Sequence, residues 1–266
     1  MHWWPRQRQY SRCCSPPAKI ESMSSPQIQS LDRLILALDY PTQSEALPAV
    51  EALNGLISWV KVGLELYLAE GRPVIDSLLQ HKLNIFLDLK LHDIPNTVAG
   101  AVRSVSGLGV GLLTLHASGG PQMLEAAANA AAKIPGAPKL LAVTVLTSMD
   151  RSQLAATGIT RTPAEQVALL GKMAIDAGVD GLVCSGEEIA LLREAIGDEP
   201  LLIVPGIRPA SSEVGDQRRV VTPASAIRSG ASKLVMGRPI TQATDPASAV
   251  RSILDEIDSC LPALRP

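Results

Sequence analysis

The stretch LILALD at residues 34–39 is a short apolar run that ends in a charged residue. A loop follows, and after it residues 43–53 carry apolar side chains at helical spacing. A continuously apolar strand is typical of a sheet whose outer face is covered by helices. The stretch therefore predicts the first strand of an α/β protein, and the question is how often the unit repeats.

Seven more apolar runs follow, at residues 59–62, 84–89, 111–115, 140–146, 181–184, 201–204 and 233–236. Candidate helices occupy residues 43–53, 73–81, 97–106, 121–133, 163–177, 187–196, 223–229 and 246–259. Alternating strands and helices imply parallel pairing, and eight units in about 235 residues match a single closed (β/α)8 TIM barrel. An open doubly wound sheet is the alternative, but no GxGxxG turn follows the first run.

The composition is that of a globular protein, with 266 residues of which 46% are hydrophobic and 19% charged. The net charge of −2 disfavours nucleic acid as a partner, because phosphate backbones select basic surfaces. The apolar runs are far shorter than the ~20 residues that cross a bilayer. We therefore expect neither a nucleic acid nor a membrane partner.

The cysteines and histidines show no metal-ligand spacing and no CxxC pair. They are Cys13, Cys14, Cys184 and Cys260, and His2, His81, His92 and His116. We expect a reducing compartment, the cytoplasm, and no metal site.

Residues 1–30 differ from the rest, because they hold three of the seven aromatic residues and four basic groups against one acid. They lack the apolar stretch of a secretory signal. They read as a disordered extension, as the result of an upstream start codon with Met23 as the working one, or as an organelle transit peptide. We expect the barrel domain to occupy residues 31–266.

Polar residues stand at the C-terminal end of almost every apolar run. In (β/α)8 barrels this end of the strands carries the active site. Each residue alone is readily explained as a solvated rim residue, but their clustering predicts a functional site. They are Asp39, Lys61, Asp88 with Lys90, His116, Thr147, Ser185, Arg208 and Arg238.

The sharpest motif is DLKLHD at residues 88–93. Strand alternation places Asp88 and Lys90 on one side, about 6–7 Å apart, and Asp93 follows the strand in a position to return toward Lys90. A lysine between carboxylates, with Lys61 nearby, stays protonated and suits proton donation rather than Schiff-base chemistry. The alternative is a structural ion-pair network. We expect His92 to face away from this cluster.

Two further segments, PGIRP at 205–209 and GRPI at 237–240, follow the last two predicted strands. Loops at these positions often form a phosphate site in such barrels. Glycine lets backbone N–H groups approach an anion, and arginine supplies charge-assisted bonds. The segments predict a phosphorylated small molecule as substrate.

Taken together, these motifs resemble the bacterial orotidine 5′-phosphate decarboxylase family over residues 34–250. The matching segments are LALDY (36–40), KVG (61–63), DLKLHDIPNT (88–97), HASGG (116–120), TVLTSM (144–149), PGIRP (205–209), GDQRR (215–219) and GRPIT (237–241).

The resemblance implies a role for each matching residue. Lys90 resembles the catalytic proton donor, with Asp88 and Lys61 beside it and Asp93 entering the neighbouring subunit's site. Ile94 and Thr97 would accompany Asp93, which implies an obligate homodimer with shared sites. Substrate contacts are implied for the ribose (Asp39, Lys61), the pyrimidine (Thr147, Ser148) and the phosphate (Gln217, Gly237, Arg238, with Arg208 in support), beneath a loop that closes after Arg208.

The implied reaction is the cofactor-free decarboxylation of orotidine 5′-monophosphate to UMP. The C6 carbanion would be stabilised and protonated by Lys90. Asp88 would also repel the substrate carboxylate, but we favour the electrostatic account. Two alternatives remain: a keto-sugar phosphate decarboxylase, which shares the Asp-x-Lys-x-x-Asp pattern and uses Mg²⁺, and a non-catalytic binding barrel. The IPNT segment and the Gln217 segment favour the nucleotide.

Overall fold

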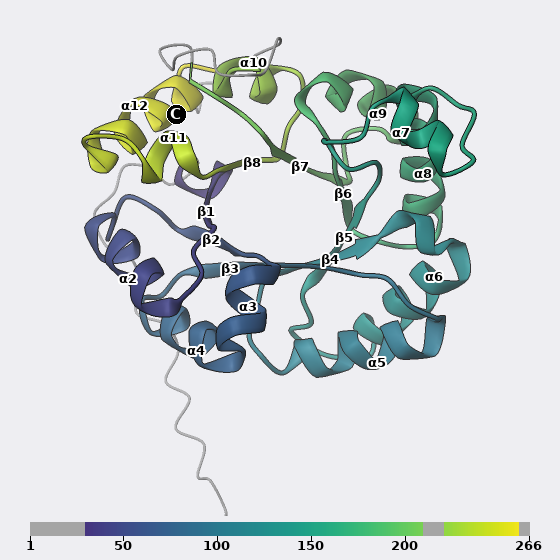
Figure 1. The fold of residues 1–266 in the computed structure, drawn as a ribbon, viewed down its shortest axis with the longest axis horizontal. Coiled ribbons are helices and arrows are strands. Elements are labelled where there is room, and N and C mark those ends of the chain that lie inside the picture. Colours follow the sequence, from purple (N-terminus) through teal and green to yellow (C-terminus); the bar gives the residue numbers. More distant parts are fainter. Residues whose placement is uncertain (1–29, 210–220, 261–266) are drawn as a thin grey trace, which may run out of the picture.

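A computed structural model describes residues 30–209 and 221–260, and in this part of the chain eight parallel strands close into a barrel (Figure 1). The strands are β1 (Leu34–Leu38), β2 (Trp59–Val62), β3 (Asn84–Leu91), β4 (Leu112–His116), β5 (Lys139–Val143), β6 (Gly181–Val183), β7 (Leu201–Pro205) and β8 (Lys233–Met236). Each strand pairs with the next along the chain, and β8 closes the ring by pairing with β1. The predicted (β/α)8 barrel is confirmed.

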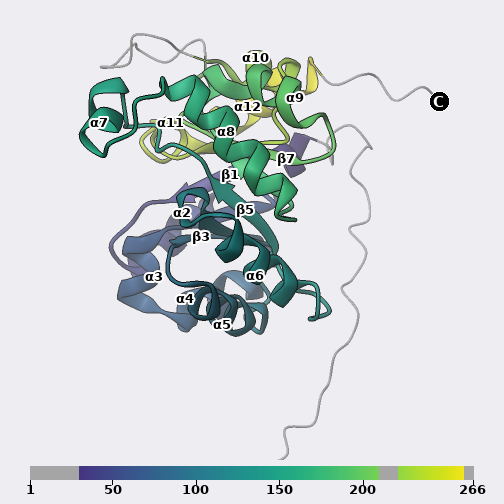
Figure 2. The same cartoon turned by 90° about the vertical axis from the view of Figure 1, so that its right-hand side faces the viewer.

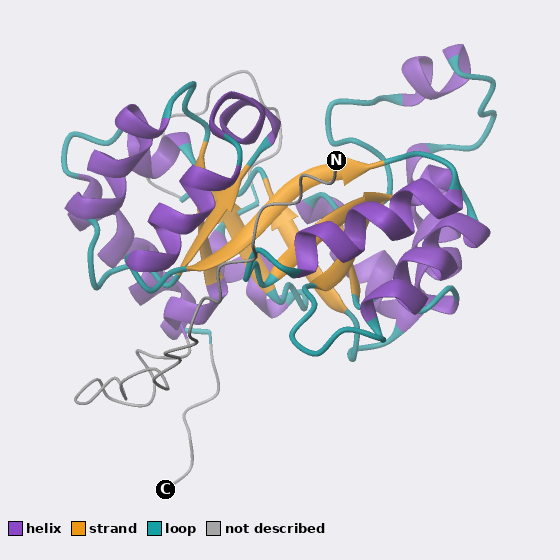
Figure 3. Ribbon diagram, turned by 90° about the horizontal axis from the view of Figure 1, so that it is seen from below, coloured by secondary structure: helices purple, strands orange, loops and turns teal. Residues whose placement is uncertain are grey.

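Helices surround the strands on the outside (Figure 3). They are α2 (Gln43–Ala52), α3 (Leu64–Glu70), α4 (Arg72–Gln80), α5 (Pro95–Ser106), α6 (Pro121–Ala131), α7 (Arg151–Ala156), α8 (Pro163–Asp176), α9 (Ile189–Ile196), α10 (Pro223–Arg228), α11 (Arg238–Thr241) and α12 (Pro246–Asp258), with 3₁₀ turns η1 (Ala117–Gly119) and η2 (Gly186–Glu188). Sequence periodicity missed α3, α7 and α11, because helices of four to seven residues are too short to show a period. Of these, α7 projects beyond the body of the barrel (Figure 2).

Local sequence explains where several helices begin. At α8, the Thr162 side chain accepts a hydrogen bond from the Glu165 N–H, and the Glu165 side chain accepts one from the Thr162 N–H. This capping box satisfies two N–H groups that lack helical partners, and Pro163 suits the first helical position because it has no N–H to lose. The same reciprocal arrangement starts α7 at Asp150 and α10 at Thr222.

The strands are apolar on both faces because each face is buried in a different cluster. Inside the barrel, Ile35, Phe86 and Leu141 pack with residues of the other strands. On the outer face, the alternate residues Leu34 and Leu36 pack against the helices. This double burial explains why the strands read as continuous rather than alternating apolar runs.

Lys233, the first residue of β8, is a buried charge at the N-terminal end of the barrel. Its ammonium forms an ion pair with the Asp32 carboxylate at 2.7 Å and lies 4.5 Å from the centre of the Trp59 ring. Burial lowers the pKa of Lys233, while the hydrogen bond and charge of Asp32 oppose that shift. The opposite end, where the strands terminate, carries Asp39, Lys61 and Asp88.

The predicted run at 140–146 is longer than the observed strand, which ends at Val143 before the chain leaves the sheet. The expectations for residues 1–29 fall outside the described residues. Within the described ranges, no helix combines the length and the apolar character needed to cross a membrane.

Candidate active site

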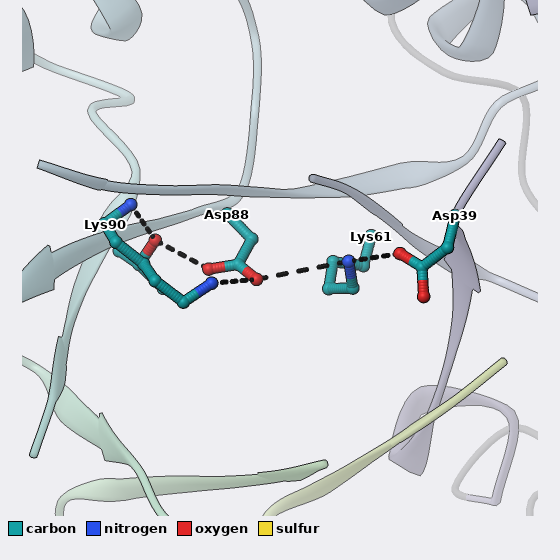
Figure 4. Close-up of polar contacts among 5 residues, drawn as sticks. Asp39, Lys61, Asp88 and Lys90 are labelled. Carbon is teal, nitrogen blue, oxygen red and sulfur yellow. Dashed lines mark hydrogen bonds and ion pairs between the residues drawn. The ribbon is translucent and has the colours of Figure 1, made fainter. Parts of the chain in front are cut away.

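Four charged side chains lie in a row of alternating sign at the C-terminal ends of β1, β2 and β3 (Figure 4). The Lys90 Nζ is 2.8 Å from Asp88 Oδ2, the Lys61 Nζ is 4.0 Å from the same oxygen, and Lys61 Nζ is 2.8 Å from Asp39 Oδ1. The inner side chains Lys61 and Asp88 are only 13% and 14% exposed, and Lys90 is 32% exposed. The row holds fixed charges in a partly dry environment, where electrostatic effects on a ligand are strong.

The backbone at Lys90 departs from the regular strand that the sequence predicts. Lys90 has a φ of 50°, and the pairing between β3 and β4 shifts register between Leu87 and Leu91. Simple alternation is therefore the wrong reason for the proximity of Asp88 and Lys90, since a bulge turns the lysine toward the aspartate. A non-glycine residue in this region costs roughly 1–3 kcal/mol and is typical of functional sites.

Thr114 is a polar residue of this cluster that the sequence interpretation missed. It is fully buried in β4, where its hydroxyl donates to Asp88 Oδ1 at 2.9 Å and accepts from the Lys90 N–H at 2.8 Å. The sequence held one sign of its role, because Thr114 stands between Leu113 and Leu115 in an otherwise apolar run. Buried hydroxyls require partners, so that position already indicated a polar network.

Two glycines make room for the Asp39 and Lys61 pair. A Cβ on Gly63 would lie 3.0 Å from Lys61 Nζ, and one on Gly237 would lie 3.3 Å from the Ala37 Cβ and 3.6 Å from Asp39 Oδ2. Any side chain at Gly63 would crowd the ammonium where it meets its two carboxylates. The resemblance associates Gly237 with phosphate binding. The structure adds that its lack of a side chain leaves room for Ala37 and Asp39.

Asp93 does not return to the lysine of its own chain, as strand geometry had suggested. Its Oδ1 accepts the Ile94 N–H at 2.6 Å, and within the described residues no ion pair joins it to Lys90. The reason is that the chain turns at once into α5, which leaves Asp93 and Thr97 exposed and Ile94 67% exposed. These three residues therefore present one exposed edge beside the mouth of the barrel.

A cavity of about 200 Å³ opens beside the charged row. Lys61, Asp88 and Lys90 line one side, and the remaining wall is formed by Phe86, Val143, Val145, Leu146, Thr147, Val183, Pro205 and Val235. A second cavity of about 470 Å³ shares Leu146, Thr147 and Pro205 with it and extends toward residues 185–188 and 206–207. The two together suit an elongated ligand with a flat, partly apolar group at its charged end.

The remaining predicted binding residues lie at the same end of the barrel, with two qualifications. Arg208 is half-buried after β7, and its N–H donates to the Val221 carbonyl at 3.2 Å, while Arg238 is exposed at the start of α11. Ser148 is exposed, and like Asp39, Arg208, Gly237 and Arg238 it lines neither of these two cavities. Gln217 and the loop that follows Arg208 lie outside the described residues.

Two histidines stack at the rim of the barrel. The rings of His92 and His116 are 5.2 Å apart, and Ser118 Oγ lies 2.7 Å from His116 Nδ1. Burial lowers the pKa of His116 below its usual value of 6.5, and the charges of His92 and Lys90 lower it further. His116 is therefore favoured in its neutral form in the folded protein.

This pKa shift predicts a loss of stability in mild acid. Below pH 6.5 the unfolded chain binds a proton at His116 that the folded chain resists, so the free energy of unfolding falls as the pH drops. Thermal melts at pH 7.5 and 5.5 are expected to show a smaller drop for His116→Gln than for the unmodified protein. His81→Gln, at the end of α4, is the control and should keep the original drop. Equal drops in all three proteins would contradict the prediction.

The described residues contain no group of three or more His, Cys, Asp or Glu side chains arranged to hold a metal ion. Within the cluster, the two Asp88 oxygens already accept from Lys90 and Thr114. This arrangement places the Lys90 ammonium beside a cavity with a mostly apolar wall, and a second ammonium and a carboxylate, Lys61 and Asp39, lie toward β1.

Comparison with known proteins agrees with this geometry. The model of the orotidine 5′-phosphate decarboxylase / HUMPS family matches residues 32–253. The orotidine 5′-phosphate decarboxylase of Actinobacillus succinogenes is 50% identical over 222 residues, covering 83% of this chain and 96% of that protein. The Gluconobacter oxydans enzyme of the same name is 50% identical over 232 residues, covering 85% and 98%.

A solved structure extends the likeness to the fold. The crystal structure of orotidine 5′-phosphate decarboxylase from Lactobacillus acidophilus superposes with a TM-score of 0.76 at 42% identity, covering 85% of this chain and 99% of that one. The match thus spans the whole described barrel and nearly the full length of each relative. The chain belongs to the orotidine 5′-phosphate decarboxylase / HUMPS family.

Proposed function

We propose that this protein decarboxylates orotidine 5′-monophosphate to UMP, the last step of pyrimidine nucleotide synthesis, and that Lys90 is the catalytic group. The observation that carries the proposal is the Lys90 ammonium, held 2.8 Å from Asp88 at the edge of the 200 Å³ cavity. The relatives of about 50% identity, all named for this activity, support the substrate. In the cell we place the reaction in the cytoplasm.

The chemistry requires a cation where carbon dioxide leaves. Breaking the bond between C6 and the carboxylate leaves an electron pair in the ring plane, where the π system delocalises it poorly. The Lys90 ammonium stabilises that pair electrostatically and then donates its proton to C6, which gives UMP, and solvent reprotonates the amine. This balance needs no redox partner and no metal, and the proposal accordingly includes no cofactor.

The remaining contacts divide along the length of the ligand. Asp39 and Lys61 hold the ribose hydroxyls, and Thr147 and Ser148 contact the pyrimidine. Gln217, Gly237 and Arg238 bind the phosphate, with Arg208 in support. Binding energy from the distant phosphate then helps to orient the reacting ring, which raises the rate of the chemical step.

We further propose a homodimer with shared active sites. Asp93, Ile94 and Thr97 are exposed on one edge near the mouth, although Ile94 is apolar. An exposed apolar side chain beside a carboxylate that has no ion-pair partner among the described residues suits a subunit interface. The Asp93 of each subunit enters the site of the other, so that Lys90 lies between two carboxylates.

The main competing function is a Mg²⁺-dependent decarboxylase of keto-sugar phosphates, since the Asp-x-Lys-x-x-Asp pattern is shared. The relatives of about 50% identity, which are named orotidine 5′-phosphate decarboxylase, favour the nucleotide over this alternative.

A single assay distinguishes these functions. Purified protein is mixed with orotidine 5′-monophosphate, and the ultraviolet absorbance of the pyrimidine is followed with and without EDTA. We expect the absorbance to fall at the same rate in both. An absence of turnover overturns the proposed function, and a rate that is lost in EDTA and restored by Mg²⁺ overturns its cofactor-free form.

A further inference from the structure

We propose that Thr114 is a positioning residue that holds both Asp88 and the backbone of Lys90 in the geometry the reaction needs. The proposal rests on the function proposed above. The Thr114 hydroxyl bridges the two residues of the central ion pair by a second route, separate from the side-chain contact between them. Together the three residues form a closed ring of hydrogen bonds.

The direction of each bond in this ring is fixed by chemistry. A backbone N–H can only donate, so the Lys90 amide donates to Thr114 Oγ1 at 2.8 Å. The hydroxyl has one proton, and its other partner is the Asp88 Oδ1 at 2.9 Å, so the proton points at the carboxylate. Each bond polarises the next in such a chain, which strengthens the hold on the carboxylate.

The Lys90 backbone depends on this hydroxyl because of the bulge. Lys90 has a positive φ, and the regular pairing of β3 with β4 is interrupted between Leu87 and Leu91. The Lys90 N–H therefore bonds to a side chain of β4 instead of a backbone carbonyl. Thr114 thus helps to retain a strained conformation that aims the lysine side chain at the cavity.

Nothing else can readily take over the role of Thr114. Its side chain is completely buried, so solvent does not reach this hydroxyl in the folded protein. Without it, the Asp88 carboxylate is free to rotate and the Lys90 backbone to relax, which moves the ammonium relative to the reacting carbon. A misplacement of about 1 Å in an active site can cost on the order of 100-fold in rate.

The test makes two comparisons that isolate the hydroxyl. The unmodified protein is compared with Thr114→Val, which replaces the hydroxyl by a methyl group of similar size. Thr114→Ser is compared with Thr114→Ala, which tests the hydroxyl in a side chain without the β-branch. Thr144→Val is the matched control, because Thr144 is also buried near a strand end but its weak bond goes to the Val183 carbonyl. Kinetics, UMP affinity and thermal melting are measured for each.

We expect Thr114→Val to lower kcat by about 10- to 100-fold, with KM and UMP affinity changed by less than about 3-fold. Thr114→Ser should keep kcat within about 3-fold of the original protein and stay well above Thr114→Ala. Thr144→Val should keep the original kcat. The split between kcat and KM and the rescue by serine separate positioning from a purely structural role.

Three outcomes would overturn the proposal: a normal kcat in Thr114→Val, equal losses in Thr114→Ser and Thr114→Ala, or a rise in KM alone. If Thr114→Val does not fold, the serine and alanine pair decides. The unmodified protein is assayed first, so inactivity there counts against the proposed function, whereas these outcomes in an active enzyme count against Thr114 alone.

Discussion

Lys90→Ala is expected to lower kcat for orotidine 5′-monophosphate by about 10⁴-fold or more, because it removes both an electrostatic stabiliser and the proton donor. Each of those two roles alone is worth at least about 100-fold in enzymes. UMP should still bind, because the proposed ribose and phosphate contacts remain. The loss is measured from the ultraviolet assay, and UMP affinity by calorimetry.

A matched control is available on the surface of α8. Lys172 forms an ion pair with Asp176, as Lys90 does with Asp88, but both Lys172 and Asp176 are exposed and belong to a helix that covers the barrel. Lys172→Ala should keep the original kcat. Turnover at the original rate in Lys90→Ala would refute its assignment, and would favour a barrel that uses other groups or only binds its ligand.

Mixing Lys90→Ala protein with Asp93→Ala protein is expected to restore activity that neither variant has alone. In a two-fold dimer each site takes Lys90 from one subunit and Asp93 from the other. A mixed dimer therefore holds one intact site and one doubly altered site, and random exchange would restore about one quarter of all sites. The activity is measured after the subunits have been mixed under mild denaturation and refolded together.

Two controls make the mixing experiment decisive. Each variant taken alone through the same denaturation and refolding should remain inactive, and unmodified protein should regain its activity. If the mixture gains nothing although exchange is demonstrated by a mass tag, the shared-site dimer is wrong. Asp93 would then act, if at all, within its own subunit.

The fold was predictable because burial on both faces leaves a strong trace in the sequence. The run at 34–38 is continuously apolar since its alternate residues enter two different clusters, and the same holds along the other strands. The placement of polar residues after these runs was predictable for a related reason. Parallel strands all end on one side of the barrel, so Asp39, Lys61 and Asp88 meet there whatever the details of the loops.

The details of the cluster were not predictable, because they depend on tertiary contacts. The positive φ of Lys90 follows from a bulge that only the pairing of β3 with β4 reveals. The outward direction of Asp93 depends on the turn into α5, and the role of Thr114 depends on which strand lies beside β3. Short helices such as α7 are set by single capping residues, which a search for periodicity does not weigh.

The position of Lys233 at the N-terminal end of the barrel bears on how the products leave the enzyme. Lys233 lies over the Trp59 ring, and Phe86, Leu141 and their neighbours fill the interior of the described barrel, which is therefore a packed core and not a channel. With the proposed reaction, carbon dioxide and UMP would both form at the C-terminal end of the strands, where the two cavities adjoin, and we expect both products to leave from that side.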